Sequence, residues 1–119
     1  MPRYMLLFAG NDETATQSRD DRERMYAEIG KWWGELSAKG VIKGGEELMP
    51  RGTATTLRRV NGAMKVSDGP FIESKEHVAG YAVIEVDDLD EAIAVAKSWP
   101  IGETGRGRTA VEVRPVVEH

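Results

Sequence analysis

Two segments of the chain are apolar at both alternating positions, and this feature most restricts what the chain can fold into. In residues 4–9, Leu6 and Phe8 share one side of an extended strand while Leu7 lies on the other. Residues 78–87 show the same two-sided pattern near their middle. Because successive side chains of a strand point to opposite faces, both segments are predicted to be strands whose sheet is covered on both faces.

Two further segments carry the period of an α-helix. Residues 18–39 begin with Ser18 and Asp21, which suit an N-cap pair, and Gly40 follows as a left-handed C-cap residue. Apolar residues recur along one side of this predicted helix, at Met25, Ile29, Trp32, Trp33 and Leu36. A second helix is predicted after Asp88 and Glu91 and ends before Pro100, with a stripe formed by Leu89, Ala92, Ile93 and Ala96.

The remaining segments are predicted to form strands and one inserted hairpin. Residues 41–48 form a strand interrupted at Gly44-Gly45, where a bulge or a close backbone approach is expected. Residues 53–60 and 63–67 are joined by Asn61-Gly62, a strong signal for a two-residue hairpin turn. A last strand is predicted over residues 109–117, after a glycine-rich segment interpreted as a surface loop.

The order of these elements predicts a single domain over residues 1–119. It is an α+β fold, a ferredoxin-like βαββαβ sandwich with an inserted β-hairpin. Two helices can cover only one face of such a sheet. Since the strands are apolar on both faces, we expect a second copy of the chain to cover the other face, which gives a homodimer with packed sheets.

Composition excludes several classes of function. The chain has 16 Lys and Arg against 20 Asp and Glu, a formal net charge of −4, with the basic residues spread along it, which argues against nucleic-acid binding. The chain has no Cys, which excludes disulfides, cysteine zinc sites and thiol nucleophiles. With no apolar run long enough to span a bilayer and no signal-peptide pattern, we expect a cytoplasmic protein without membrane contact.

A set of short motifs carries a family resemblance. The central one is Asp68-Gly69-Pro70-Phe71, followed by Glu73, Lys75, Glu76 and Gly80-Tyr81. The other motifs of the set are Gly44-Gly45-Glu46, Thr53-Ala54-Thr55, Asp87-Asp88-Leu89-Asp90-Glu91-Ala92 and Val111-Glu112-Val113-Arg114-Pro115. Together they cover essentially the whole chain, which resembles the YCII-related family in its DGPF-motif branch.

The resemblance implies a dimeric α+β barrel of ferredoxin-like protomers, with a cavity between sheet and helices for a small organic substrate. It implies no cofactor, and an accessory role beside extracytoplasmic-function sigma factors in the DGPF branch. Relatives outside that branch are thought to pair a His on the first helix with an Asp. The predicted first helix of this chain contains no His, so that pair is not carried over.

The candidate catalytic residues surround the DGPF motif. Asp68 lies in a turn where an Asp accepts backbone hydrogen bonds, yet a rigid turn at a cavity mouth would also hold it as a base. Glu73 and His77 belong to a dense ionisable cluster with Lys75, which shares the strand parity of Glu73. His77 has a side chain suited to proton transfer near neutral pH, although most lone histidines are structural. A solvated strand edge explains the cluster equally well, and no spacing here predicts a metal site.

Lys75 and several other residues are candidates for binding a substrate. Glu112 and Arg114 share one parity of the last strand, so Arg114 either binds a carboxylate or pairs with an acid. Arg22 falls inside the apolar stripe of the first helix, where it snorkels over the helix end or reaches an anionic ligand. Glu46 and Tyr81 are expected to line the same space. The Trp residues are interpreted as two core positions and one helix end.

The residues leave two functions open. One is a small enzyme without a cofactor that performs acid–base chemistry of the lyase or isomerase type on an organic acid or a phenol. The other is a non-catalytic ligand-binding or regulatory protein linked to a sigma factor. A purely structural dimer would not account for the charged cluster.

Overall fold

The computed structural model describes residues 1–11, 17–72, 74–101 and 108–119, and it has an α+β architecture. Within these residues the elements are the strands β1 (Arg3–Gly10), β2 (Ile42–Glu47), β3 (Thr55–Val60), β4 (Ala63–Asp68), β5 (His77–Glu85) and β6 (Arg108–Pro115), the helices α1 (Arg19–Ala38) and α2 (Leu89–Lys97), and a 3-10 turn, Arg51–Thr53. The predicted order of elements is confirmed. The predicted loop between α2 and β6 lies at residues 102–107, outside the described residues.

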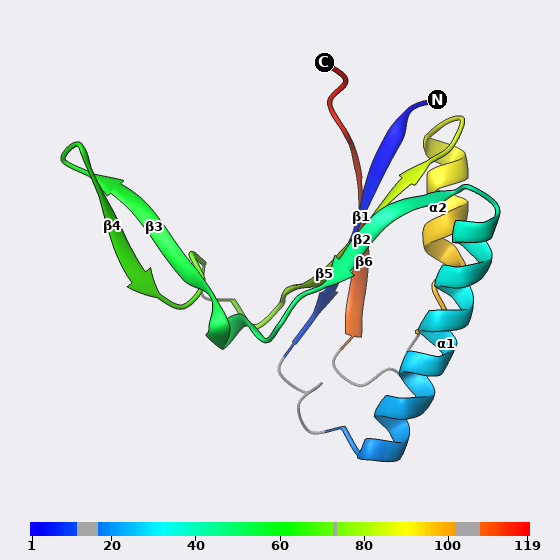
Figure 1. The fold of residues 1–119 in the computed structure, drawn as a ribbon, viewed down its shortest axis with the longest axis horizontal. Coiled ribbons are helices and arrows are strands. Elements are labelled where there is room, and N and C mark those ends of the chain that lie inside the picture. Colours follow the sequence, from blue (N-terminus) through cyan, green and yellow to red (C-terminus); the bar gives the residue numbers. More distant parts are fainter. Residues whose placement is uncertain (12–16, 73, 102–107) are drawn as a thin grey trace.

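Antiparallel pairing gives a main sheet with the strand order β2-β5-β1-β6 in the described part of the chain. Strand β1 lies between β5 and β6, and the two crossovers contain α1 and α2, which is the ferredoxin-like arrangement. Both helices lie on one side of the main sheet (Figure 1). The hairpin formed by β3 and β4 is a separate sheet that projects away from the opposite side.

Local signals in the sequence account for the ends and turns of these elements. The Ser18 side chain accepts a hydrogen bond from the Asp21 amide at 3.1 Å, and the Asp88 carboxylate accepts one from the Glu91 amide at 2.9 Å. Asn61 and Gly62 both have positive φ, 52° and 83°, as a type I′ hairpin turn requires. The predicted caps and the predicted turn are therefore confirmed.

The core lies between the helices and the main sheet. It contains the buried residues of one parity in β1 and β5, which pack against residues from both helices. An aromatic cluster holds the layers together: the Phe8 and Trp99 rings stack with centroids 4.2 Å apart, and the Trp32 ring meets Trp99 edge-on at 5.1 Å. The Trp32 indole nitrogen also donates a hydrogen bond to the Ser98 hydroxyl at 2.8 Å.

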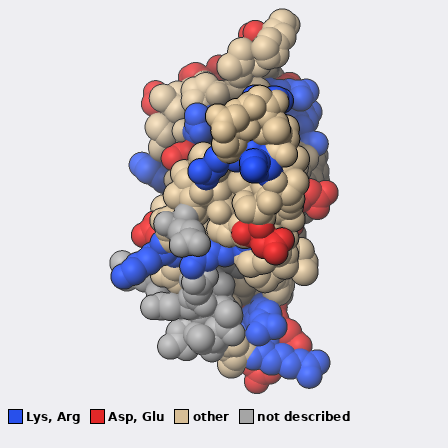
Figure 2. Space-filling model, turned by 90° about the vertical axis from the view of Figure 1, so that its left-hand side faces the viewer, with Lys and Arg blue, Asp and Glu red and all other residues tan. Residues whose placement is uncertain are grey.

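The other face of the main sheet carries no helix among the described residues, and we call it the open face. Met5, Leu7 and Val83 lie on it, half-buried, between the buried positions of β1 and β5. The hairpin beside it exposes further apolar side chains, at Leu57, Met64 and Val66. Seen from the hairpin side, much of the surface is uncharged, interrupted by both basic and acidic side chains (Figure 2).

The described helices are not long and apolar enough to cross a membrane.

Gly45 marks a close approach between layers. It has a φ of 150°, and a Cβ built there would lie 2.6 Å from the Trp33 ring and 2.8 Å from the Ala82 Cα. The register of β2 shifts between Ile42 and Gly44, so the predicted bulge is confirmed as well. Only a residue without a side chain lets Trp33 pack directly on this edge strand.

Gly45→Ala is therefore expected to lower the free energy of unfolding by about 2 kcal/mol or more, because it adds overlap and backbone strain together. The matched control is Gly44→Ala, since nothing lies within 4 Å of a Cβ at Gly44. Urea denaturation of both variants measures the difference. Equal stability of the two variants would contradict this account of the packing.

Candidate functional site

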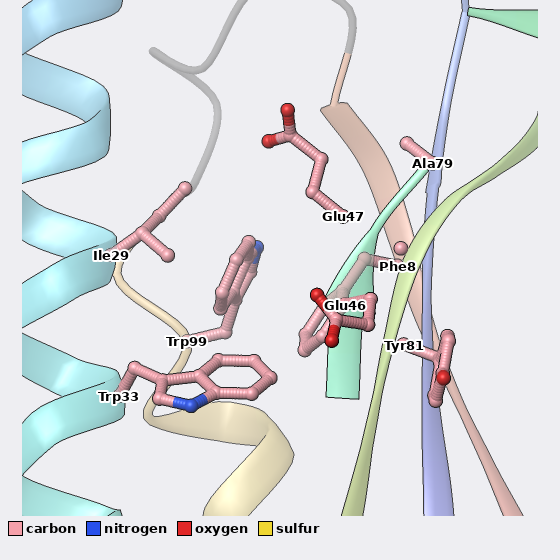
Figure 3. A pocket seen from close by; sticks show the side chains of 9 residues that line it. Phe8, Ile29, Trp33, Glu46, Glu47, Ala79, Tyr81 and Trp99 are labelled. Atoms are coloured by element: carbon pink, nitrogen blue, oxygen red, sulfur yellow. The ribbon is translucent and has the colours of Figure 1, made fainter. Parts of the chain in front are cut away.

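A pocket lies between α1 and the main sheet, and we call it the aromatic pocket. Its volume is about 60 Å³, and it is lined by Phe8, Ile29, Trp33, Glu46, Glu47, Ala79, Gly80, Tyr81 and Trp99. Because one water needs about 10–15 Å³ of such space, the pocket has room for several waters or a small organic group. Ile29 and Trp33 project into it from α1, with the Trp99 indole near them (Figure 3).

The aromatic walls come from three parts of the fold. Phe8 belongs to β1, Trp33 to α1, and Trp99 follows the end of α2. Because Trp99 stacks on Phe8 and is met edge-on by the buried Trp32, its ring is held in place from two sides. The interpretation of the Trp residues as core and helix-end positions was thus incomplete, since Trp33 and Trp99 also line a pocket.

Two carboxylates stand at the edge-strand side of the aromatic pocket. Glu46 and Glu47 are consecutive in β2, so their side chains leave opposite faces of the strand. Glu46 lies opposite Tyr81 and Glu47 lies opposite Gly80 in the pairing with β5. Both glutamates are exposed. Through these pairings Glu47 shares the helix face with Phe8, and Glu46 shares the open face with Tyr81 and Leu7.

Glu47 is positioned by a tyrosine of α1. The Tyr26 hydroxyl donates a hydrogen bond to the Glu47 carboxylate at 2.8 Å, joining α1 to the end of β2. Tyr26, Ile29 and Trp33 follow one another at intervals of three and four residues, so they share one face of the helix. Sequence reasoning missed Tyr26 and Glu47; this spacing is a signal that could have found Tyr26, whereas none pointed to Glu47.

Of the residues predicted to bind substrate, Glu46 and Tyr81 do line the aromatic pocket. Arg22 lies elsewhere on α1, where its guanidinium reaches the Gln17 carbonyl at 3.5 Å. Arg114 lies 3.9 Å from Glu112, and both are well exposed on β6. Lys75 is exposed in the segment before β5.

The predicted catalytic residues are not gathered at the aromatic pocket. Asp68 is the last residue of β4, and Glu73 lies outside the described residues. The hydrogen bond from the Gly69 amide to the Ala54 carbonyl, at 2.8 Å, closes the base of the hairpin beside Asp68. This placement agrees with the structural role of an Asp in a turn, and a catalytic role for Asp68 stays a prediction.

His77 is turned toward the helix side by a bulge. The register between β1 and β5 shifts after Phe8, so Ala79 is an extra residue and His77 lies opposite the buried Gly10. Its Nδ1 atom is buried without a hydrogen-bond partner among the described residues. His77 is not part of the pocket lining, and its catalytic role also stays a prediction.

No group of three His, Asp or Glu side chains in the described part of the chain is arranged to hold a metal ion. The aromatic pocket offers the chemistry of a carboxylate, Glu47, oriented by a phenol beside an apolar cavity. Such an arrangement can bind a small molecule and can accept a proton from it.

Comparison with known proteins shows the family to which this chain is related. The family model for the YCII-related domain matches residues 3–119. The chain belongs to the YCII-related family. A relative within it is an uncharacterised protein of Rhizobium meliloti (strain 1021), which is 32% identical over 108 residues, covering 89% of this chain and 86% of the relative. The family resemblance predicted from the sequence is confirmed, whereas the assignment of this YCII-related protein to the DGPF branch stays a prediction.

The link between Tyr26 and Glu47 is testable by a double-mutant cycle. Tyr26→Phe and Glu47→Gln are expected to show a coupling free energy of about 1 kcal/mol, because the bond joins a hydroxyl to a charged acceptor at the surface. Urea unfolding of the two single variants and the double variant measures it. Tyr26→Phe combined with Glu46→Gln is the matched control, in which the two effects should add.

Proposed function

We propose that this YCII-related protein binds a small organic molecule in the aromatic pocket and moves a proton on it, with Glu47 as the base. The observation that supports this most directly is the hydrogen bond from the Tyr26 hydroxyl to the Glu47 carboxylate at the edge of an apolar pocket. That bond orients the carboxylate, and the remaining lone pairs of its oxygens are available to a ligand.

The proposed reaction is an isomerisation through an enol. One oxygen of Glu47 takes a proton from a carbon next to a carbonyl, the C–H electron pair becomes the new C=C bond, and the carbonyl oxygen gains negative charge. The protonated Glu47 then returns the proton to another position of the substrate. Phe8, Trp33 and Trp99 supply an apolar wall beside the reacting carbon.

A second function is a ligand-binding or regulatory protein that leaves its ligand unchanged, as the proposed link to a sigma factor would require. It is favoured by the placement of Asp68 and His77, neither of which lines the aromatic pocket. In this alternative Glu46 and Glu47 select the ligand rather than react with it. The expectations of no cofactor, no nucleic-acid partner and a cytoplasmic location stay predictions under both functions.

Proton exchange with solvent distinguishes the two functions. In D₂O, we expect the protein to accelerate deuterium incorporation into at least one of three small carbonyl compounds, namely aminoacetone, acetone and pyruvate, as followed by ¹H NMR. Glu47→Gln should lower that acceleration about 100-fold or more, because it removes the base.

The matched control is Glu28→Gln, an exposed glutamate of α1 outside the pocket lining, which should exchange like the wild type. Binding of a probe without any acceleration of exchange would support the ligand-binding alternative. Equal rates in Glu47→Gln and the wild type would remove Glu47 from the mechanism.

We also propose that the protein works as a homodimer joined through the open face. The chain exposes 8392 Å², whereas a compact monomer of 13.1 kDa exposes about 6,400 Å². Its radius of gyration is 16.2 Å, against about 13.5 Å for a compact domain of this length. The excess of roughly 2,000 Å² per protomer is the size of surface that permanent dimers bury.

Sedimentation tests the proposed dimer at micromolar concentration. The wild type should have twice the mass of the 13.1 kDa chain. Leu7→Asp should sediment as a monomer, because it places a charge in the middle of the open face. Leu89→Asp is the control: it changes an exposed leucine at the start of α2 and should leave the dimer intact. A monomeric wild type would overturn this proposal.

A further inference from the structure

The charge of the aromatic pocket opposes the organic acid expected from the sequence. Its ionisable lining residues are Glu46, Glu47 and Tyr81, and none of the described lining residues is a Lys, Arg or His. The basic candidates, Arg22 and Arg114, are placed outside the lining. A carboxylate ligand entering this pocket would meet the like charge of Glu47 and no cationic side chain among the described lining residues, which disfavours an anion and attracts a cation.

The aromatic side chains of the pocket also favour a positively charged ligand. The Phe8, Trp33 and Trp99 rings line it, and the faces of aromatic rings attract cations, with Trp the most effective. Sites that bind ammonium groups combine several such rings, and an acidic side chain nearby adds to the attraction. Here the rings of Trp33 and Trp99 lie on one side of the pocket and the Glu47 carboxylate on the other (Figure 3).

The rings are held before any ligand arrives. Trp99 stacks on Phe8 at 4.2 Å, and Trp32 meets both the Trp99 ring and the Trp33 ring edge-on, at 5.1 and 6.3 Å. Trp32 is itself tied to Ser98 by its indole hydrogen bond of 2.8 Å. A preformed set of walls binds its ligand without the entropic cost of ordering the side chains.

We infer that the ligand of the aromatic pocket is a small organic cation, an ammonium group carried on a compact apolar body. This inference rests on the proposed function and names its ligand class. If each heavy atom takes the 10–15 Å³ that one water needs, the volume of about 60 Å³ holds a group of roughly four to six heavy atoms. The ammonium lies against the rings, and Glu47, on the helix face of β2, supplies the countercharge.

Tetramethylammonium and tert-butanol have the same number of heavy atoms and so separate charge from size, and pivalate adds a carboxylate to the tert-butyl group of the neutral probe. Binding is followed on the indole N–H signals in ¹H–¹⁵N NMR spectra of the full chain. Trp33 and Trp99 line the pocket and should shift, while Trp32, whose nitrogen is bonded to Ser98, is an internal control. We expect tetramethylammonium to bind about tenfold or more tightly than tert-butanol, and pivalate most weakly.

The double substitution Glu46→Gln and Glu47→Gln should weaken tetramethylammonium binding severalfold and leave tert-butanol binding unchanged. Glu28→Gln on α1 should alter neither. Tighter binding of pivalate than of tetramethylammonium, or no preference among the probes, would overturn the cation assignment while leaving a ligand pocket in place. If none of the probes shifts the Trp33 or Trp99 signal, the cation assignment fails, and the proposed function fails with it.

Discussion

The packing of aromatic rings between helices and sheet is the interaction on which the rest of this structure depends. Phe8, Trp32 and Trp99 come from three separate elements and meet in one cluster, with Trp99 stacked on Phe8 and Trp32 against it. The cluster sets the separation between α1 and the main sheet. Because large rings leave gaps that small side chains would close, the same packing leaves the aromatic pocket beside them.

The two faces of the main sheet have different consequences. The helix face is covered by the two helices of the same chain. The packing is close at Gly45, where there is no room for a Cβ beside Trp33. The open face keeps Met5, Leu7 and Val83 only half-buried and has the exposed apolar residues of the hairpin beside it. A chain with this much uncovered apolar surface is well suited to self-association, and the aromatic pocket would then lie on the outer, helix-bearing side of each protomer.

Much of the fold could be predicted because its signals are local. Ser18 caps α1 through the next turn of its own helix, and Asn61-Gly62 needs only two residues to reverse the chain. The bulge at Gly44-Gly45 was also expected from glycines within one strand. For the site, the sequence singled out Glu46 and Tyr81, which line the pocket, but it also favoured the DGPF motif, whose Asp68 ends a hairpin strand instead.

The sequence by itself determined the elements, their order and the turns, because periodicity and caps act within a few residues. Only the tertiary structure decided which elements meet. Tyr26 reaches Glu47 across 21 positions, and Phe8 stacks on a tryptophan near the other end of the chain. Periodicity shows that a residue faces inward, but it does not show which distant residue it contacts. The pocket is formed by such contacts between residues distant in the sequence.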